Sequence, residues 1–269
     1  MSVVSRAPCG VRSILFDLGS TLWERQDERV LKRNKREAEA CAVALVQSLL
    51  ATGAAVALWE GAFAAVAEAS WGRELRARAL RATDAAFQAR PQREPDFVAL
   101  HLDALRALGI HTDDARWGAM LYEALRIRSA PTRALFPDAL PTLETLRRRG
   151  YALGIVTNRA YGGAVFVDDL RQMGLLDYFP LERIAVSADL RVRKPHPMIF
   201  RYALEGVATD ARETAMVGND LYADVVGARQ LGLFSVWKRE EGAPAAPPDG
   251  PDTPDAVITR LEELLALFP

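Results

Sequence analysis

The chain has 269 residues, of which half are apolar and 26% are charged, and its formal net charge is -1. This near-neutral balance excludes a global field that would attract nucleic acid or an anionic membrane, and no apolar run is long enough to span a bilayer. The two cysteines, Cys9 and Cys41, lie far apart, which argues against a disulfide framework or a zinc site. The N-terminus lacks a signal-peptide pattern, so we expect a soluble, cytoplasmic protein.

The first predicted element is a strand that ends in an aspartate. Residues 1–10 carry no periodic pattern and are expected to be loosely held. The apolar run from Ser13 to Phe16 predicts a buried strand of a parallel sheet, and Asp17 follows it directly. Ligands of open α/β sheets bind just beyond the carboxyl ends of the strands. Asp17 is therefore placed either as a nucleophile or metal ligand, or as a cap after a core strand. This stretch alone favours neither.

A long region of helix-forming residues comes next. Helices are predicted over residues 28–50, 54–69, 72–90, 97–108 and 113–127. Pro91 and Pro95 mark a break, and Gly109 marks the end of one helix. Nothing between about Arg25 and Ala130 indicates a strand. We therefore expect an all-helical insert over residues 25–130.

From Pro131 onward, predicted strands and helices alternate. Strands are predicted at residues 152–156, 183–186, 214–217, 234–236 and 256–258, and helices at 139–149, 165–173, 199–205, 224–231 and 261–268. Residues 240–254 are rich in Pro, Ala and Gly and predict a surface loop. This alternation is typical of right-handed βαβ units around a parallel sheet.

Polar residues stand where four of these strands or their loops end. They are Asp17, Thr157 with Asn158, Lys194, and Asn219 with Asp220 and Asp224. Taken singly, each has an ordinary structural explanation: Thr157 and Asp220 as helix caps, and Lys194 as a solvated surface charge. Because the carboxyl ends of parallel strands share one edge of the sheet, the set together favours a functional site.

The order and spacing of these residues resemble the haloacid dehalogenase superfamily of hydrolases, which are mostly phosphatases. The matching segments are Phe-Asp-Leu-Gly-Ser-Thr-Leu at 16–22, Ile-Val-Thr-Asn at 155–158, Arg-Lys-Pro-His-Pro-Met-Ile-Phe at 193–200 and Val-Gly-Asn-Asp-Leu-Tyr-Ala-Asp-Val-Val-Gly-Ala at 217–228. The resemblance implies an α/β fold with a Rossmann-like, three-layer, parallel-sheet core from residues 11–24 and 131–269. It also implies that the insert, residues 25–130, is the helical cap domain that closes over the active site.

The resemblance also implies a mechanism. Asp17 would attack phosphorus and form an aspartyl-phosphate, while Thr157 and Lys194 would hold the phosphoryl oxygens. Mg²⁺ would be the cofactor, bound by Asp17, the Gly19 carbonyl, Asn219, Asp220 and Asp224. We predict substrate contacts from Ser20, Thr21, Trp23, Arg25 and Asn158. The expected partner is a small phosphorylated metabolite, with no nucleic acid or membrane, and the expected assembly is a monomer or homodimer.

Two departures from the family pattern weaken this expectation. Gly19 stands where the phosphatases usually have a second aspartate that acts as general acid and base, so we expect a preference for substrates with good leaving groups, such as anomeric or acyl phosphates. Glu24, Asp27 and Glu28 are the candidates to replace that acid, although each fits better as a solvated charge at a helix start. Asn219 replaces a common metal-binding aspartate, so we expect weaker metal binding.

Two alternatives follow from these departures. Dehalogenases of the superfamily need neither the acid nor the metal, so a hydrolytic 2-haloacid-type dehalogenase acting through Asp17 is one alternative. Arg25 and Asn158 are the available candidates for a halide site. The other is a weakly active or non-catalytic interaction protein that uses the large cap as a binding surface.

Overall fold

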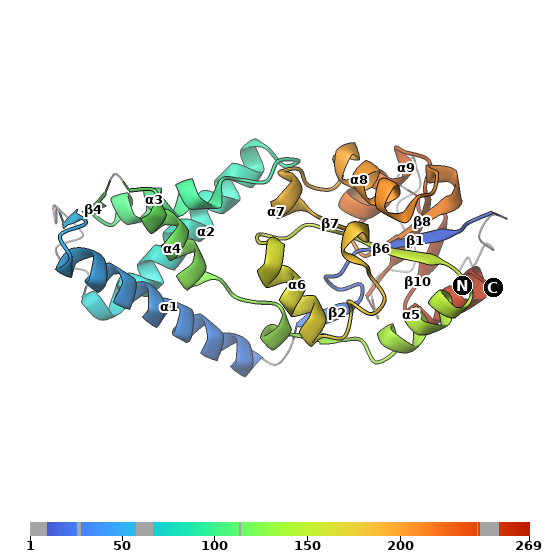
Figure 1. The fold of residues 1–269 in the computed structure, drawn as a ribbon, viewed down its shortest axis with the longest axis horizontal. Coiled ribbons are helices and arrows are strands. Elements are labelled where there is room, and N and C mark those ends of the chain that lie inside the picture. Colours follow the sequence, from blue (N-terminus) through green and yellow to red (C-terminus); the bar gives the residue numbers. More distant parts are fainter. Residues whose placement is uncertain (1–9, 26–27, 58–66, 113, 241, 243–252) are drawn as a thin grey trace. The chain divides into compact units, whose positions relative to one another are not determined.

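The computed structural model describes residues 10–25, 28–57, 67–112, 114–240, 242 and 253–269. The chain divides into two compact units, one formed by residues 1–25 with 133–269 and the other by residues 26–132. We call them the core unit and the inserted unit. Figure 1 shows a strand-containing core unit and an inserted unit made mainly of helices.

The core unit contains a six-stranded parallel sheet. Its strands, in spatial order, are β10 (Ala256–Ile258), β9 (Phe234–Lys238), β8 (Thr214–Gly218), β1 (Ser13–Phe16), β6 (Ala152–Thr157) and β7 (Ile184–Val186). Every neighbouring pair is parallel, with β1 between β6 and β8. All four β1 residues are buried, as a strand covered on both faces requires. The predicted Rossmann-like α/β fold is confirmed.

Helices flank this sheet. They are α5 (Ala139–Arg148), α6 (Gly163–Gln172), α7 (Ser187–Leu190), α8 (Pro197–Val207), α9 (Gly227–Arg229) and α10 (Leu264–Leu267). The apolar face of α8, with Ile199, Phe200 and Ala203, packs against strand residues such as Leu15 and Met216. This burial fixes the strands, and therefore the edge at which they end.

The described part of the inserted unit consists mainly of the helices α1 (Glu28–Ala51), α2 (Trp71–Ala89), α3 (Phe97–Ala107) and α4 (Arg116–Leu125). Buried leucines from different helices form its core, including Leu75 of α2, Leu105 of α3 and Leu121 of α4. A Cβ atom at Gly72 would collide with the backbone of Glu39. A glycine at that position therefore lets α2 approach α1 closely.

The expectation of an all-helical insert was wrong in detail. β3 (Val56–Ala57) pairs antiparallel with β4 (Ile110–His111) inside the inserted unit. In the core unit, β2 (Trp23–Arg25) pairs antiparallel with β5 (Arg133–Leu135), so Arg25 lies in a strand. Two- and three-residue strands have no detectable sequence period, and the Ala-rich stretch that contains β3 favours helix by propensity. Residues 58–66 of the predicted 54–69 helix lie outside the described residues.

The helix expected at residues 224–231 also begins differently. A π-helical turn covers Leu221–Val226 and continues into α9. The Asp220 side chain accepts hydrogen bonds from the N–H groups of Tyr222 and Ala223, so it caps this turn. Most of the predicted 240–254 loop, like residues 1–9, lies outside the described residues.

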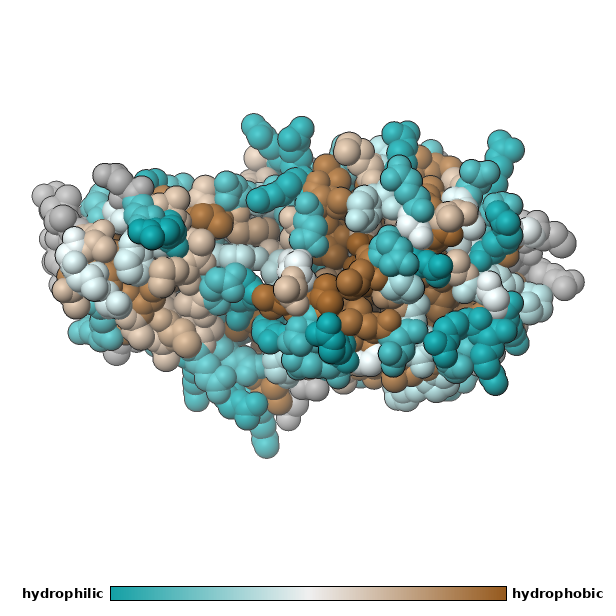
Figure 2. All heavy atoms as spheres, in the orientation of Figure 1, coloured by the Kyte–Doolittle hydropathy of each residue, from teal (hydrophilic) through white to brown (hydrophobic). Residues whose placement is uncertain are grey.

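The face drawn in Figure 2 carries both hydrophilic and apolar residues. Within the described ranges, no helix combines the length and the apolar character needed to cross a membrane.

His101 in α3 gives a testable pH dependence. Burial lowers its pKa, and the hydrogen bond of its Nδ1 with the Phe97 carbonyl only partly opposes this. A histidine whose pKa is lower in the folded state contributes full stability above its unfolded pKa of about 6.5, and that stability is lost as the pH falls through this value. We expect His101→Gln, which does not titrate, to lose less stability than the wild type between pH 7 and pH 5. Urea unfolding at each pH measures the difference, and parallel profiles would contradict it.

Candidate active site

Asp17 lies at the carboxyl edge of the sheet, immediately after β1. Its N–H donates to the Val217 carbonyl at 2.9 Å, which ties it to the neighbouring strand β8. In register, Phe16 lies beside Ile155 of β6 and Val217 of β8. The three strands therefore end together. Asp17 itself is only 7% exposed. Asp17 is therefore held at the edge where ligands of open α/β sheets bind, and its role as a nucleophile stays a prediction.

Lys194 joins two carboxylates. Its Nζ lies 2.6 Å from Asp17 Oδ1 and 2.6 Å from Asp224 Oδ1. All three side chains are buried, with Asp224 1% exposed and Lys194 4% exposed. Lys194 therefore contacts both carboxylates and is not a solvated surface charge.

The electrostatics of this trio follow from burial. Burial alone would lower the pKa of Lys194, but the carboxylates of Asp17 and Asp224 outweigh it and leave that pKa raised. Burial, reinforced by the charge of Asp17, raises the pKa of Asp224 above its usual range, although Lys194 opposes this. The two carboxylates are therefore incompletely compensated by one ammonium, and a further cation would stabilise them.

Asn158 holds the main chain of Lys194. The Lys194 N–H donates to Asn158 Oδ1 at 2.8 Å, and Asn158 Nδ2 donates to the Lys194 carbonyl at 3.2 Å. Its amide thus fixes the loop that delivers the ammonium. Contact between Asn158 and a substrate remains a prediction.

The loop after Asp17 is tightly hydrogen-bonded. The Leu18 carbonyl accepts from the N–H groups of Leu22 and Trp23, and the Ser20 N–H donates to the Trp23 carbonyl at 2.7 Å. Ser20 has a φ of 54°, in the left-handed region that non-glycine residues seldom adopt. The Thr21 hydroxyl donates to Asp17 Oδ2 at 3.3 Å, so this predicted substrate residue contacts the candidate nucleophile.

The space beside Gly19 is open. A Cβ atom added there would have only Asp17 Oδ2 within 4 Å, at 4.0 Å. This opening is where the side chain of a second aspartate would begin. Asp17 Oδ1 already contacts Lys194, so Oδ2 is the oxygen that faces this open space.

The acidic corner is only partly as predicted. Asp224 Oδ2 accepts from the Asp220 N–H at 3.0 Å, and Asp220 is used as the helix cap described above. The Asn219 carbonyl accepts from Trp237 Nε1 at 2.9 Å. Within the described residues, no cluster of three or more His, Cys, Asp or Glu side chains is arranged to hold a metal.

The donor set nevertheless fits Mg²⁺. This ion is usually bound through one or two carboxylates together with waters and substrate phosphate. Asp17 and Asp224 provide two carboxylates that share one ammonium, so one negative charge of the pair is left for a further cation. Asp17 and Asp224 would therefore hold it, and the family resemblance adds the Gly19 carbonyl as a further ligand.

The remaining predicted site residues are Thr157, predicted to be catalytic, and the substrate residues Trp23 and Arg25. Thr157 is the last residue of β6 and is buried, and Trp23 is fully buried. Nε1 of Trp23 has no hydrogen-bond partner among the described residues, so it is a donor that a ligand or water would satisfy. The Arg25 side chain lies outside the described part of the chain, as does Asp27, one of the acids considered as a replacement for the missing aspartate.

Sequence reasoning missed two cations near this edge. The Arg159 guanidinium lies 5.4 Å from the centre of the Trp23 ring, and Lys238 ends β9 with its Nζ 3.1 Å from the Ser20 carbonyl. Arg159 directly follows the Thr157-Asn158 segment, and Lys238 stands at a strand end. Their positions in the sequence could therefore have identified both cations as candidate site residues.

Comparison with known proteins now defines the class. A family model of haloacid dehalogenase-like hydrolases matches residues 11–232, and the chain belongs to that family. It is 39% identical to a glyceraldehyde 3-phosphate phosphatase of Pyrococcus abyssi over 102 residues, covering 38% of this chain and 41% of the relative. It is 36% identical to a phosphoserine phosphatase of Thermus thermophilus over 123 residues, covering 44% and 46%. The chain spans about half the length of the curated relatives it matches.

Solved structures resemble the whole chain. A 2-haloacid dehalogenase from Pseudomonas syringae pv. Tomato DC3000 is similar with a TM-score of 0.58 and 27% identity, covering 96% of this chain and 97% of that one. A phosphatase of the same family from Thermococcus onnurineus is similar with a TM-score of 0.55 and 24% identity, covering 94% and 96%. At 24% identity, the similarity to the Thermococcus onnurineus phosphatase shows the fold alone.

Proposed function

We propose that the protein is a Mg²⁺-dependent phosphatase that hydrolyses a small phosphorylated metabolite through an aspartyl-phosphate on Asp17. The observation that carries this proposal is the buried Lys194 ammonium between Asp17 and Asp224, at the sheet edge where ligands of this fold bind. The phosphatase names of relatives that are 34–39% identical over part of the chain support it.

In the proposed reaction, each residue of the site has its own role. Oδ2 of Asp17 attacks phosphorus, the bond from phosphorus to the ester oxygen breaks, and the leaving oxygen takes a proton from solvent. Water then attacks phosphorus and frees the Asp17 carboxylate. Lys194 and Thr157 hold the phosphoryl oxygens as charge spreads over them. When bound by Asp17, Asp224 and the Gly19 carbonyl, Mg²⁺ would neutralise charge between two anions.

The open position at Gly19 sets the expected substrate preference. No side chain there can protonate the leaving oxygen, and general acid help typically contributes ~10²–10⁴ in rate. Substrates whose leaving group departs without protonation, such as acyl or anomeric phosphates, should therefore react best. This is the substrate class that we assign.

Gly19→Asp tests this assignment. The added side chain enters open space 4.0 Å from Asp17 Oδ2, so it should fit without displacing the loop. We expect hydrolysis of primary alkyl phosphates to rise by about 10²-fold or more, with little change for acyl phosphates. Gly19→Asn, of similar size but without an acidic proton, is the matched control. Equal effects of the two variants on alkyl phosphates would contradict the assignment.

A hydrolytic dehalogenase is the second candidate. The similarity to a 2-haloacid dehalogenase covers nearly the whole chain, and Gly19 supplies no acid, which halide departure does not need. Asp17 would then attack carbon rather than phosphorus.

The experiment that separates the candidates measures phosphate release from a panel that includes acyl, anomeric and alkyl phosphates, with and without Mg²⁺. Halide release from short 2-haloacids is measured in parallel, with the wild type and Asp17→Asn. Metal-dependent phosphate release that Asp17→Asn lacks would support the phosphatase. Halide release without phosphate release would replace it with the dehalogenase.

A further inference from the structure

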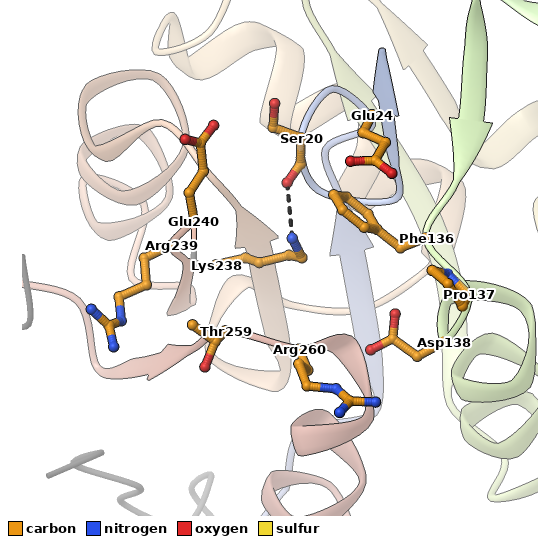
Figure 3. Close-up of a pocket in the computed structure, with 10 residues that line it drawn as sticks. All are labelled: Ser20, Glu24, Phe136, Pro137, Asp138, Lys238, Arg239, Glu240, Thr259 and Arg260. Atoms are coloured by element: carbon orange, nitrogen blue, oxygen red, sulfur yellow. Dashed lines mark hydrogen bonds between the residues drawn. The ribbon is translucent and has the colours of Figure 1, made fainter. Parts of the chain in front are cut away.

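Lys238 is a buried lysine beside the Asp17 loop. It is the last residue of β9 and is 5% exposed. Its Nζ donates to the Ser20 carbonyl at 3.1 Å and lies 3.8 Å from the centre of the Phe136 ring. Figure 3 draws this hydrogen bond and the ring. Lysine is almost never fully buried unless it is paired. Here its partners are a main-chain carbonyl and an aromatic face, which suggests that the ammonium serves the loop.

Carboxylates surround the Lys238 ammonium. Burial lowers its pKa, while the carboxylates of Asp138, Glu24 and Glu240 oppose that effect and favour the charged form. The same residues line a pocket of about 600 Å³ beside the ammonium (Figure 3). These carboxylates favour the ammonium form of Lys238, which is the form that donates to the Ser20 carbonyl.

Ser20 is the residue that needs this support. With its φ of 54°, it occupies a strained backbone conformation that persists only when its surroundings hold it. Its N–H is tied to the Trp23 carbonyl at 2.7 Å, and its carbonyl is tied to Lys238. Both peptide groups of Ser20 are thus fixed. One of them is the peptide that joins Ser20 to Gly19, two residues after Asp17.

Phe136 completes the support. Its N–H donates to the Leu22 carbonyl at 3.0 Å, so the residue that carries the ring is bonded to the same loop. A cation over an aromatic face is attracted by the negative charge of the ring. The Phe136 ring therefore helps to position the ammonium for its hydrogen bond with the Ser20 carbonyl.

We propose that Lys238 is a positioning residue for the candidate active site: it holds Ser20 in its left-handed conformation and so aligns Gly19 and Asp17 for attack. The proposal rests on the proposed function for its catalytic consequence. Its structural part, the ordering of residues 18–23, does not depend on which substrate is used. Lys238 is distinct from the Asp17–Lys194–Asp224 trio and acts through the main chain.

The test compares Lys238→Met, which keeps the apolar stem, with Lys238→Arg, which keeps the charge. Arg239→Met is the matched control, because Arg239 is the next residue and points away from Ser20 (Figure 3). The pocket gives water access to the freed Ser20 carbonyl, so we expect Lys238→Met to fold. Amide hydrogen exchange should become faster in the peptide that covers residues 18–23 in Lys238→Met, and not in Arg239→Met.

A second readout concerns alignment for attack. Beryllofluoride with Mg²⁺ mimics a phosphoryl group on aspartate, and ¹⁹F NMR detects it without any substrate. We expect the wild type to bind it, Lys238→Met to bind it at least about tenfold more weakly, and Lys238→Arg to recover part of the loss. If the wild type turns over a substrate, kcat should fall by about tenfold or more in Lys238→Met, with KM changing much less.

A double variant guards against a trivial loss of folding. Ser20→Gly removes the steric cost of a positive φ, so the loop should need Lys238 less, and Lys238→Met should cost less in that background. Unchanged exchange and unchanged beryllofluoride binding in Lys238→Met, or equal effects of Lys238→Met and Arg239→Met, would overturn the proposal. Failure of the wild type to bind beryllofluoride would count against the proposed function alone, since the exchange result is read independently.

Discussion

Asp17→Asn should lose phosphate release by on the order of 10⁴-fold or more, because an amide oxygen is a poor nucleophile and loss of a catalytic nucleophile removes the whole covalent route. The substitution keeps the size of the side chain and an oxygen that can accept from Lys194, whose Nζ lies 2.6 Å from Asp17 Oδ1. The variant should therefore fold. Initial rates with the best substrate of the panel, at saturating Mg²⁺, measure the effect.

The control for this prediction is Asp220→Asn. Asp220 caps the π-helical turn through its Oδ1, and an asparagine oxygen can accept the same bonds. We expect a far smaller loss of rate from this substitution. Comparable losses at Asp17 and Asp220 would mean that the acidic corner, rather than Asp17, determines activity.

Lys194→Met should give the second large effect, on stability as well as on rate. Removing the ammonium leaves Asp17 and Asp224 buried with no cation between them, and breaking a buried ion pair from one side typically costs about 3–5 kcal/mol. Equilibrium urea unfolding measures the loss. The hydrolysis rate should fall together with it, since the same ammonium holds the phosphoryl oxygens in the proposed reaction.

Mg²⁺ should partly rescue the stability of Lys194→Met. A cation bound by the two carboxylates replaces the lost charge, and a ligand that binds only the folded state stabilises it by mass action. The increase in the urea midpoint with Mg²⁺ should be larger for Lys194→Met than for the wild type. An equal increase in both proteins would show that the ion does not bind at these carboxylates.

Much of the core unit was predictable because its strands are buried on both faces. Runs such as Ser13–Phe16 and Thr214–Gly218 are short and mostly apolar. Asp17 directly follows the first run, and the second ends at Gly218. The parallel pairing of β1 with β6 and β8 then follows from alternation with helices. The meeting of Asp17, Lys194 and Asp224 follows in turn, since strand ends share one edge.

What the sequence did not reveal depends on contacts between distant residues. The ribbon of β2 with β5 joins segments more than a hundred residues apart, and neither segment has a period of its own. Asn158 reads as a substrate contact from its position but is occupied by the main chain of Lys194. Lys238 carries no motif, and its role becomes visible only when its ammonium is found at the Ser20 carbonyl.

Asp220 shows the opposite outcome. The sequence allowed two interpretations of Asp220, a helix cap and a metal ligand. In the structure its side chain caps the π-helical turn. The neighbouring Asp224 is the acid that reaches Lys194. A motif therefore identified the right segment, while side-chain contacts were needed to tell which of its residues faces Asp17.

The most direct test of the central claim is to find the phosphoryl group on Asp17. The wild type is mixed with acetyl phosphate and Mg²⁺, quenched in acid within the first turnover, digested and analysed by mass spectrometry. We predict one phosphoryl group on the peptide that contains Asp17, labile to hydroxylamine and absent from Asp17→Asn. Turnover of the phosphate with no phosphoryl group on that peptide, or a group on another residue, would contradict the account.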